Sequence, residues 1–200
     1  VNSSAASDVY KRQWQLGPTS LMLAGLVFTA LLIAMAGIDM DTQLLPDTLT
    51  LPLLWLGLLL SVPVLVPSLF ASLFTFEITV VRSSVLPVTP TDSILGAVFG
   101  YGALWGVFHL FRLITGKEGM GYGDFKLLGA LGAWMGWQML LPIIIISAGV
   151  GSVIGIVMLV TGLTKRTQPI PFGPYLALAG WIAFLWGPAL TRTFLNVYGI

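Results

Sequence analysis

The chain has 200 residues, of which 56% are hydrophobic and 8% are charged. Soluble domains carry about 25% charged residues, so this composition excludes an ordinary soluble globular protein and a disordered chain. Nine basic residues against eight acidic ones leave no basic surface for nucleic acid, and the absence of cysteine excludes disulfides and cysteine zinc sites. We therefore predict an all-α fold, a polytopic transmembrane helical bundle of about six spans embedded in a lipid bilayer.

The first 13 residues differ in composition from the rest of the chain. They are rich in serine and lack the apolar core of a signal peptide. We interpret residues 1–13 as a non-native or disordered tail, and residues 14–200 as one membrane-embedded domain.

A helix needs about 20 apolar residues to cross a bilayer. Apolar runs of suitable length follow one another along the chain, and we expect spans at 20–38, 49–66, 94–114, 125–140, 141–163 and 175–190. The shorter run at 68–81 contains Glu77 and fits a re-entrant or interfacial piece. Pro142 suggests a turn between the fourth and fifth spans.

Glycines recur at four-residue spacing within these runs. Examples are Gly96 with Gly100 and Gly132 with Gly136. Small residues let helix backbones approach closely, so this spacing predicts tight helix packing.

Successive crossings would place the polar segments 39–48, 115–124 and 164–171 on one side of the membrane. Five basic residues lie near these segments, against four on the other side, of which two belong to the 1–13 tail. This bias favours the first side as cytoplasmic. Asp39 and Asp124 would then lie at the same face, although they are distant in sequence.

Acidic residues at membrane depth are costly and are usually functional. Asp39, Asp41 and Asp47 follow the first span, and Asp124 begins a later one. Two neighbouring carboxyls share one proton, so one can act as a base and the other as an acid on a bound water. Alternatively, the glycines before Asp124 form only a turn, and Asp124 only caps a helix.

Several other residues lie near these acids in the sequence and have a possible role in the site. Gly121 and Gly123 would leave room for an extended peptide beside Asp124. Asp47 follows Pro46 and is expected to cap the second span, whereas Asp41 either supports the site or is simply solvated. Lys117 and Lys126 either steer a substrate or anchor the chain at the interface.

Three stretches in this order resemble a known family. The segment 38–47, IDMDTQLLPD, is similar to the first signature of bacterial type IV prepilin peptidases, and 116–126, GKEGMGYGDFK, is similar to the second, which contains a Gly-x-Gly-Asp box. The segment 169–175, PIPFGPY, resembles the proline-rich entry to the family's last span, with Pro171, Gly173 and Pro174 as candidate contacts.

The resemblance implies an aspartic endopeptidase of the bacterial inner membrane. Such enzymes remove the leader of prepilins or pseudopilins on the cytoplasmic side. The resemblance assigns Asp39 and Asp124 as the catalytic pair and Gly121, Tyr122 and Gly123 as the active-site loop. It implies no metal and no cofactor for proteolysis.

Some family members also methylate the new N-terminus with S-adenosylmethionine. The sequence shows no cofactor-binding turn after a strand. The 200 residues contain no cysteine-rich zinc domain of the kind that often precedes the first span, so we expect either a truncated fragment or a minimal form of the family. The stretch 61–91 is also longer than the family's loop. A function of a different class, a small proton- or ion-coupled transporter, would use the same acids, but nearer the middle of the bilayer.

Overall fold

A computed structural model describes residues 20–62, 88–116, 120–161 and 171–198, with side chains between residues 24 and 187 of those ranges. These residues form six α-helices and one short 3-10 helix, and they contain no strand. The elements are α2 (Ser20–Thr42), α3 (Asp47–Ser61), α5 (Pro90–Thr115), α6 (Tyr122–Met135), η2 (Trp137–Met139), α7 (Leu140–Val160) and α8 (Gly173–Tyr198). The prediction of an all-α bundle is therefore confirmed.

Three of the described helices are long and apolar enough to cross a membrane. They cover Ala24–Thr42, Pro90–Thr115 and Trp137–Val160, and Asp47–Ser61 and Gly173–Gly187 form shorter apolar helices. This agrees with a membrane-type bundle. The 1–13 tail and the expected re-entrant piece at 68–81 lie outside the described residues.

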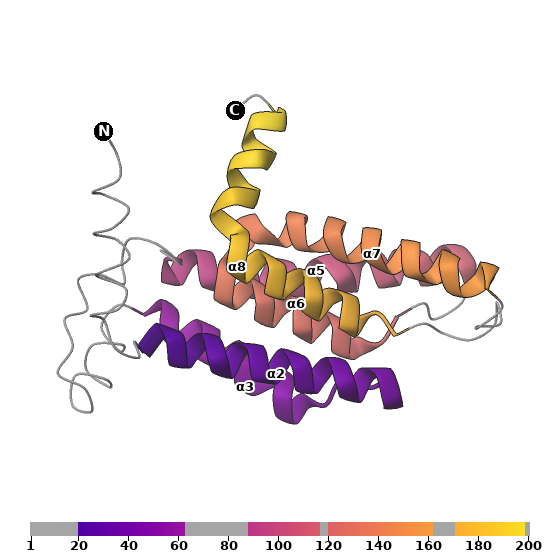
Figure 1. Ribbon diagram of the computed structural model, residues 1–200, viewed down its shortest axis with the longest axis horizontal. Coiled ribbons are helices and arrows are strands. Elements are labelled where there is room, and N and C mark those ends of the chain that lie inside the picture. The colour runs from indigo at the N-terminus through magenta and orange to yellow at the C-terminus, as the bar shows by residue number, and fades with distance from the viewer. Residues whose placement is uncertain (1–19, 63–87, 117–119, 162–170, 199–200) are drawn as a thin grey trace.

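Helix α6 lies at the centre of the bundle, with α3, α5 and α8 packed around it (Figure 1). Every residue from Asp124 to Met135 except Lys126 is buried. A helix that is apolar on all sides has to be covered by its neighbours. Because α6 is central, its neighbours α3, α5 and α8 are held in place by packing against it.

Two glycines explain how closely α5 approaches α6. A Cβ on Gly96 would overlap the carbonyl oxygen of Gly132, and a Cβ on Gly132 would overlap that of Gly96. The hydroxyl of Ser93 donates a hydrogen bond of 2.6 Å to the carbonyl of Ala133 along the same contact. The predicted packing role is confirmed at these positions, whereas Gly102 faces open space.

The expected turn at Pro142 is wrong. Helix α6 ends at Met135 because Gly136 has a φ of 81°, a left-handed conformation that favours glycine. Pro142 instead lies buried in the first turn of α7, where a missing backbone N–H costs nothing. Helix α6 therefore ends at Met135, before the predicted end of the 125–140 run.

Trp134 lies inside the bundle and joins two of its helices. Its ring is buried, and its Nε1 donates a 2.7 Å hydrogen bond to the carbonyl of Leu53 in α3. The indole thus joins α3 to α6 inside the bundle.

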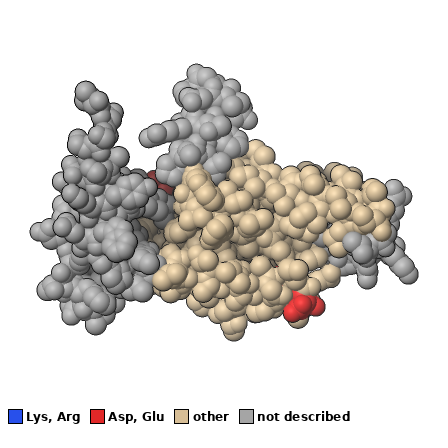
Figure 2. Space-filling view, in the orientation of Figure 1, with Lys and Arg blue, Asp and Glu red and all other residues tan. Residues whose placement is uncertain are grey.

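The end of α2 and the beginning of α8 lie together at one end of the bundle (Figure 1). The face of the described residues visible in Figure 2 carries little charge, with one acidic group at this end and a second, partly covered one toward the opposite end. The candidate functional residues therefore gather at one end of a largely apolar surface.

Candidate active site

Asp39 lies near the end of α2, in the last full turn of the helix. The helix stops at Thr42 because Gln43 adopts a φ of 56°, which is uncommon for a residue other than glycine. The side chain of Asp39 is 4% exposed. The backbone N–H of Gly173, at the start of α8, donates a 3.1 Å hydrogen bond to its Oδ2. The first and third signature stretches therefore meet at this carboxyl.

Asp124 lies in the first turn of α6, outside the three long spans, and is 5% exposed. Burial, and to a lesser extent the negative charge of Asp39, raise the pKa of Asp124 to about 7, while a backbone hydrogen bond from Gly121 opposes the shift. The two acids therefore interact through space. A carboxyl with this pKa can gain and lose a proton near neutral pH, as general acid–base catalysis requires.

Leu45 is a site residue that the sequence analysis missed. It lies in the linker between α2 and α3, where a Cβ on Gly123 would come within 2.5 Å of the Leu45 Cβ. A Cβ on Gly173 would come within 3.2 Å of the Leu45 Cδ1 and 2.5 Å of Asp39 Oδ2. One leucine thus contacts the second and third signatures. In the sequence, Leu45 could have been recognised as an apolar residue within a short polar linker.

These contacts change the interpretation of the glycines before Asp124. Gly123 does not leave room for a peptide, because Leu45 of the chain itself occupies that space. Gly121 is exposed, and the nearest atom to a Cβ there would be Asp124 Oδ2 at 4.0 Å. Of the two glycines, therefore, Gly121 alone has the open surroundings that the sequence analysis expected of both.

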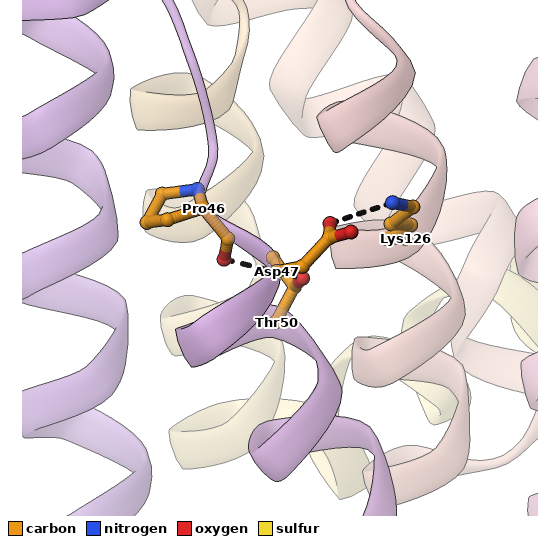
Figure 3. Close-up of polar contacts among 4 residues, drawn as sticks. All are labelled: Pro46, Asp47, Thr50 and Lys126. Carbon is orange, nitrogen blue, oxygen red and sulfur yellow. Dashed lines mark hydrogen bonds and ion pairs between the residues drawn. The ribbon is translucent and has the colours of Figure 1, made fainter.

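The expected helix cap at Asp47 is wrong by one residue. Pro46 occupies the cap position of α3, and Asp47 is the first helical residue. Its Oδ1 forms an ion pair with Nζ of Lys126, in the first turns of α6, at a distance of 2.6 Å (Figure 3). Asp47 and Lys126, which were expected to act separately, therefore form one contact between α3 and α6.

The remaining candidates lie around this centre. Asp41 is exposed, and its side chain makes no hydrogen bond or ion pair with any described residue. Tyr122 is 52% exposed, and its ring packs against Phe108 and Phe125. Pro174 borders a groove between α2 and α8, and Pro171 borders another between α7 and α8. Lys117 lies outside the described residues.

Neither groove fits S-adenosylmethionine. That molecule carries a sulfonium, an ammonium, a carboxylate and ribose hydroxyls, which need several polar partners. The groove of Pro174 is lined by apolar side chains and Thr29, and the groove of Pro171 has Ser152 and Tyr175 as its polar residues. No charged side chain lines either one. In the described ranges, no three His, Cys, Asp or Glu side chains are placed to hold a metal ion.

Comparison with known proteins gives consistent matches. Residues 26–156 match the model of the type IV leader peptidase family. A prepilin leader peptidase/N-methyltransferase of Pseudomonas aeruginosa is 52% identical over 93% of the chain, and one of Stutzerimonas stutzeri is 50% identical over 92%. A relative of the same name from Xanthomonas campestris is 46% identical over 94%.

The chain spans little more than half the length of these relatives, since the matches cover 57%, 54% and 58% of them. No solved structure matches the chain.

Proposed function

The chain belongs to the type IV leader peptidase family, and we propose that it is an aspartic endopeptidase that removes the leader peptide of prepilins or pseudopilins. The observation that carries this proposal is the pairing of two buried acids from different signatures. Asp39 and Asp124 are each at most 5% exposed, and the charge of one acts on the other. The position of Asp124 at the start of α6 favours an endopeptidase over a transporter, whose acids lie nearer mid-membrane.

In the proposed mechanism the two carboxyls share one proton. The ionised carboxyl removes a proton from a water molecule between them, and the resulting hydroxide attacks the carbonyl carbon of the scissile bond. The protonated carboxyl stabilises the developing oxyanion and then supplies a proton to the leaving amine. The Gly173 N–H holds Asp39 in place throughout. No covalent intermediate and no cofactor take part.

The same proposal places the protein in the bacterial inner membrane as a multi-pass protein, with the site at the cytoplasmic side. The apolar spans and the basic residues near the site support this orientation. The proposed substrate is the N-terminal segment of a prepilin, whose apolar helix lies in the bilayer while its leader reaches the two acids.

A cleavage assay tests the proposal. Purified protein in detergent is mixed with a prepilin-like peptide that carries a basic leader ending in glycine, and mass spectrometry locates the cut. We expect one cut after that glycine, unaffected by a chelator. Cleavage elsewhere in the peptide, or inhibition by the chelator, would contradict the proposal.

Methyl transfer is a separate question, because the names of the relatives include N-methyltransferase activity. The two grooves that border Pro174 and Pro171 do not fit S-adenosylmethionine, so we derive no methylation step from them. Adding S-adenosylmethionine to the same assay tests this directly, since methylation would increase the mass of the product.

A further inference from the structure

We infer that the Asp47–Lys126 ion pair is a positioning contact, which holds the linker after Asp39 against the helix that carries Asp124. The inference rests on the proposed function and names two residues that act on the reaction without touching the substrate. The pair joins residues 79 positions apart, and its Nζ–Oδ1 distance is 2.6 Å (Figure 3).

The linker between α2 and α3 transmits the position of Asp47 to the site. It is only four residues long, from Gln43 to Pro46, and it packs against the site through Leu45. At its far end the carbonyl of Pro46 accepts hydrogen bonds from the backbone N–H groups of Leu49 and Thr50, at 3.1 and 3.2 Å. Pro46 is thereby part of the first turn of α3, so a shift of that turn moves Leu45 as well.

On the other side of the contact, Lys126 follows Asp124 by two residues in α6. Side chains two positions apart on a helix point in roughly opposite directions. Asp124 is buried toward Asp39, whereas Lys126 reaches α3. The first turn of α6 is therefore held on two sides, by Leu45 against Gly123 and by Asp47 against Lys126.

Because the ion pair is partly exposed, its effect on the position of the acids can be distinguished from its effect on overall stability. The side chains of Lys126 and Asp47 are 32% and 55% exposed, and exposed ion pairs contribute little to the free energy of unfolding. Catalysis is more sensitive, because a displacement of about 1 Å between reacting groups can lower a rate by orders of magnitude. Loss of the pair should therefore change the rate of cleavage much more than the melting temperature.

A double-mutant cycle on the full chain tests the inference. Asp47→Asn, Lys126→Gln and the double variant are compared with the parent by kcat, KM and thermal unfolding in detergent. We expect each single variant to lower kcat by about tenfold with KM within about twofold, and the double variant to be no worse than either single one. Lys126→Arg, which keeps the charge, should retain most of the activity. Asp92→Asn is the control for the loss of a carboxylate, since the side chain of Asp92 contacts Thr89, Trp137 and Gln138 outside the site, and this variant should leave kcat unchanged.

Several outcomes would overturn the inference. If the two losses in kcat multiply in the double variant, the residues act independently. If Lys126→Gln raises KM and leaves kcat intact, Lys126 binds the substrate directly. If the pair variants cleave at the parental rate while Asp39→Asn is inactive, the inference fails but the proposed function stands. If Asp39→Asn and Asp124→Asn cleave like the parent, the proposed function fails and the inference fails with it.

Discussion

The backbone N–H of Gly173 donates a hydrogen bond to the carboxylate of Asp39, across 134 positions of sequence and a distance of 3.1 Å. Because the donor is a backbone N–H, which among the substitutions only proline removes, this contact depends on the path of the chain into α8. It brings the proline-rich stretch before the last helix into contact with one of the two proposed catalytic acids. The beginning of α8 is thus a support for one of the two acids.

Gly173→Ala should disrupt this contact. The new Cβ would come within 2.5 Å of Asp39 Oδ2, so the carboxyl or the helix start must move. We expect kcat for leader cleavage to fall by at least about tenfold, because the displaced acid no longer faces Asp124. Gly102→Ala is the matched control, since no atom lies within 4 Å of its Cβ. Parental cleavage by Gly173→Ala would show that the contact is dispensable.

Gly121 and Gly123 should respond differently to alanine, although both precede Asp124. At Gly123 the new Cβ would come within 2.5 Å of the Leu45 Cβ, and overpacking of this kind costs about 1–3 kcal/mol. At Gly121 the backbone is extended and the surroundings are open. Thermal unfolding in detergent should show a lower melting temperature for Gly123→Ala and little change for Gly121→Ala. Equal melting temperatures would mean that Leu45 does not pack as described.

The contact between α5 and α6 should tolerate no side chain at its centre. Gly96→Ala and Gly132→Ala each introduce a Cβ that overlaps a backbone carbonyl of the opposite helix. Backbone atoms cannot rotate away, so we expect a large loss of folded protein and a clearly lower melting temperature. Gly106→Ala, which faces open space on the same helix as Gly96, provides the comparison and should behave like the parent.

Asp124 should make stability depend on pH. Its pKa is raised from 3.8 to about 7 in the folded protein, so between these values the unfolded chain loses the proton more readily than the folded one. The stabilisation associated with the protonated carboxyl is complete below about pH 4 and is lost as the pH rises through about 7.

The Asp124→Asn variant cannot ionise at this position, so it does not lose stability through this group as the pH rises. The melting temperature of the variant, relative to the parent, should therefore rise between about pH 4 and about pH 7 and then level off. A difference that is constant with pH, or that shrinks as the pH rises, would show that Asp124 is not buried beside another negative charge.

The fold class could be predicted from composition alone, because a chain with so few charges has to bury its backbone polar groups in helices within a membrane. The proximity of Asp39 and Asp124 could also be predicted, since alternate crossings would return the chain to the same side. These predictions depend on the number and order of apolar runs. They do not need exact helix ends.

The details that failed depend on single backbone angles and on contacts between distant residues. The turn at Gly136 follows from its left-handed φ, which hydropathy does not reveal. The capping prediction at Asp47 missed the ion pair because Lys126 is 79 positions away. Gly123 looked like space for a substrate because the sequence does not show that Leu45 packs there.

The central claim is that Asp39 and Asp124 together activate one water molecule. Its most direct test is the rate of cleavage of a prepilin-like peptide by Asp39→Asn and Asp124→Asn, each shown by thermal unfolding to be folded. We predict that both variants lose detectable cleavage and that the parent shows a bell-shaped pH profile, whose two apparent pKa values belong to the pair. Cleavage at the parental rate by either folded variant would contradict the claim.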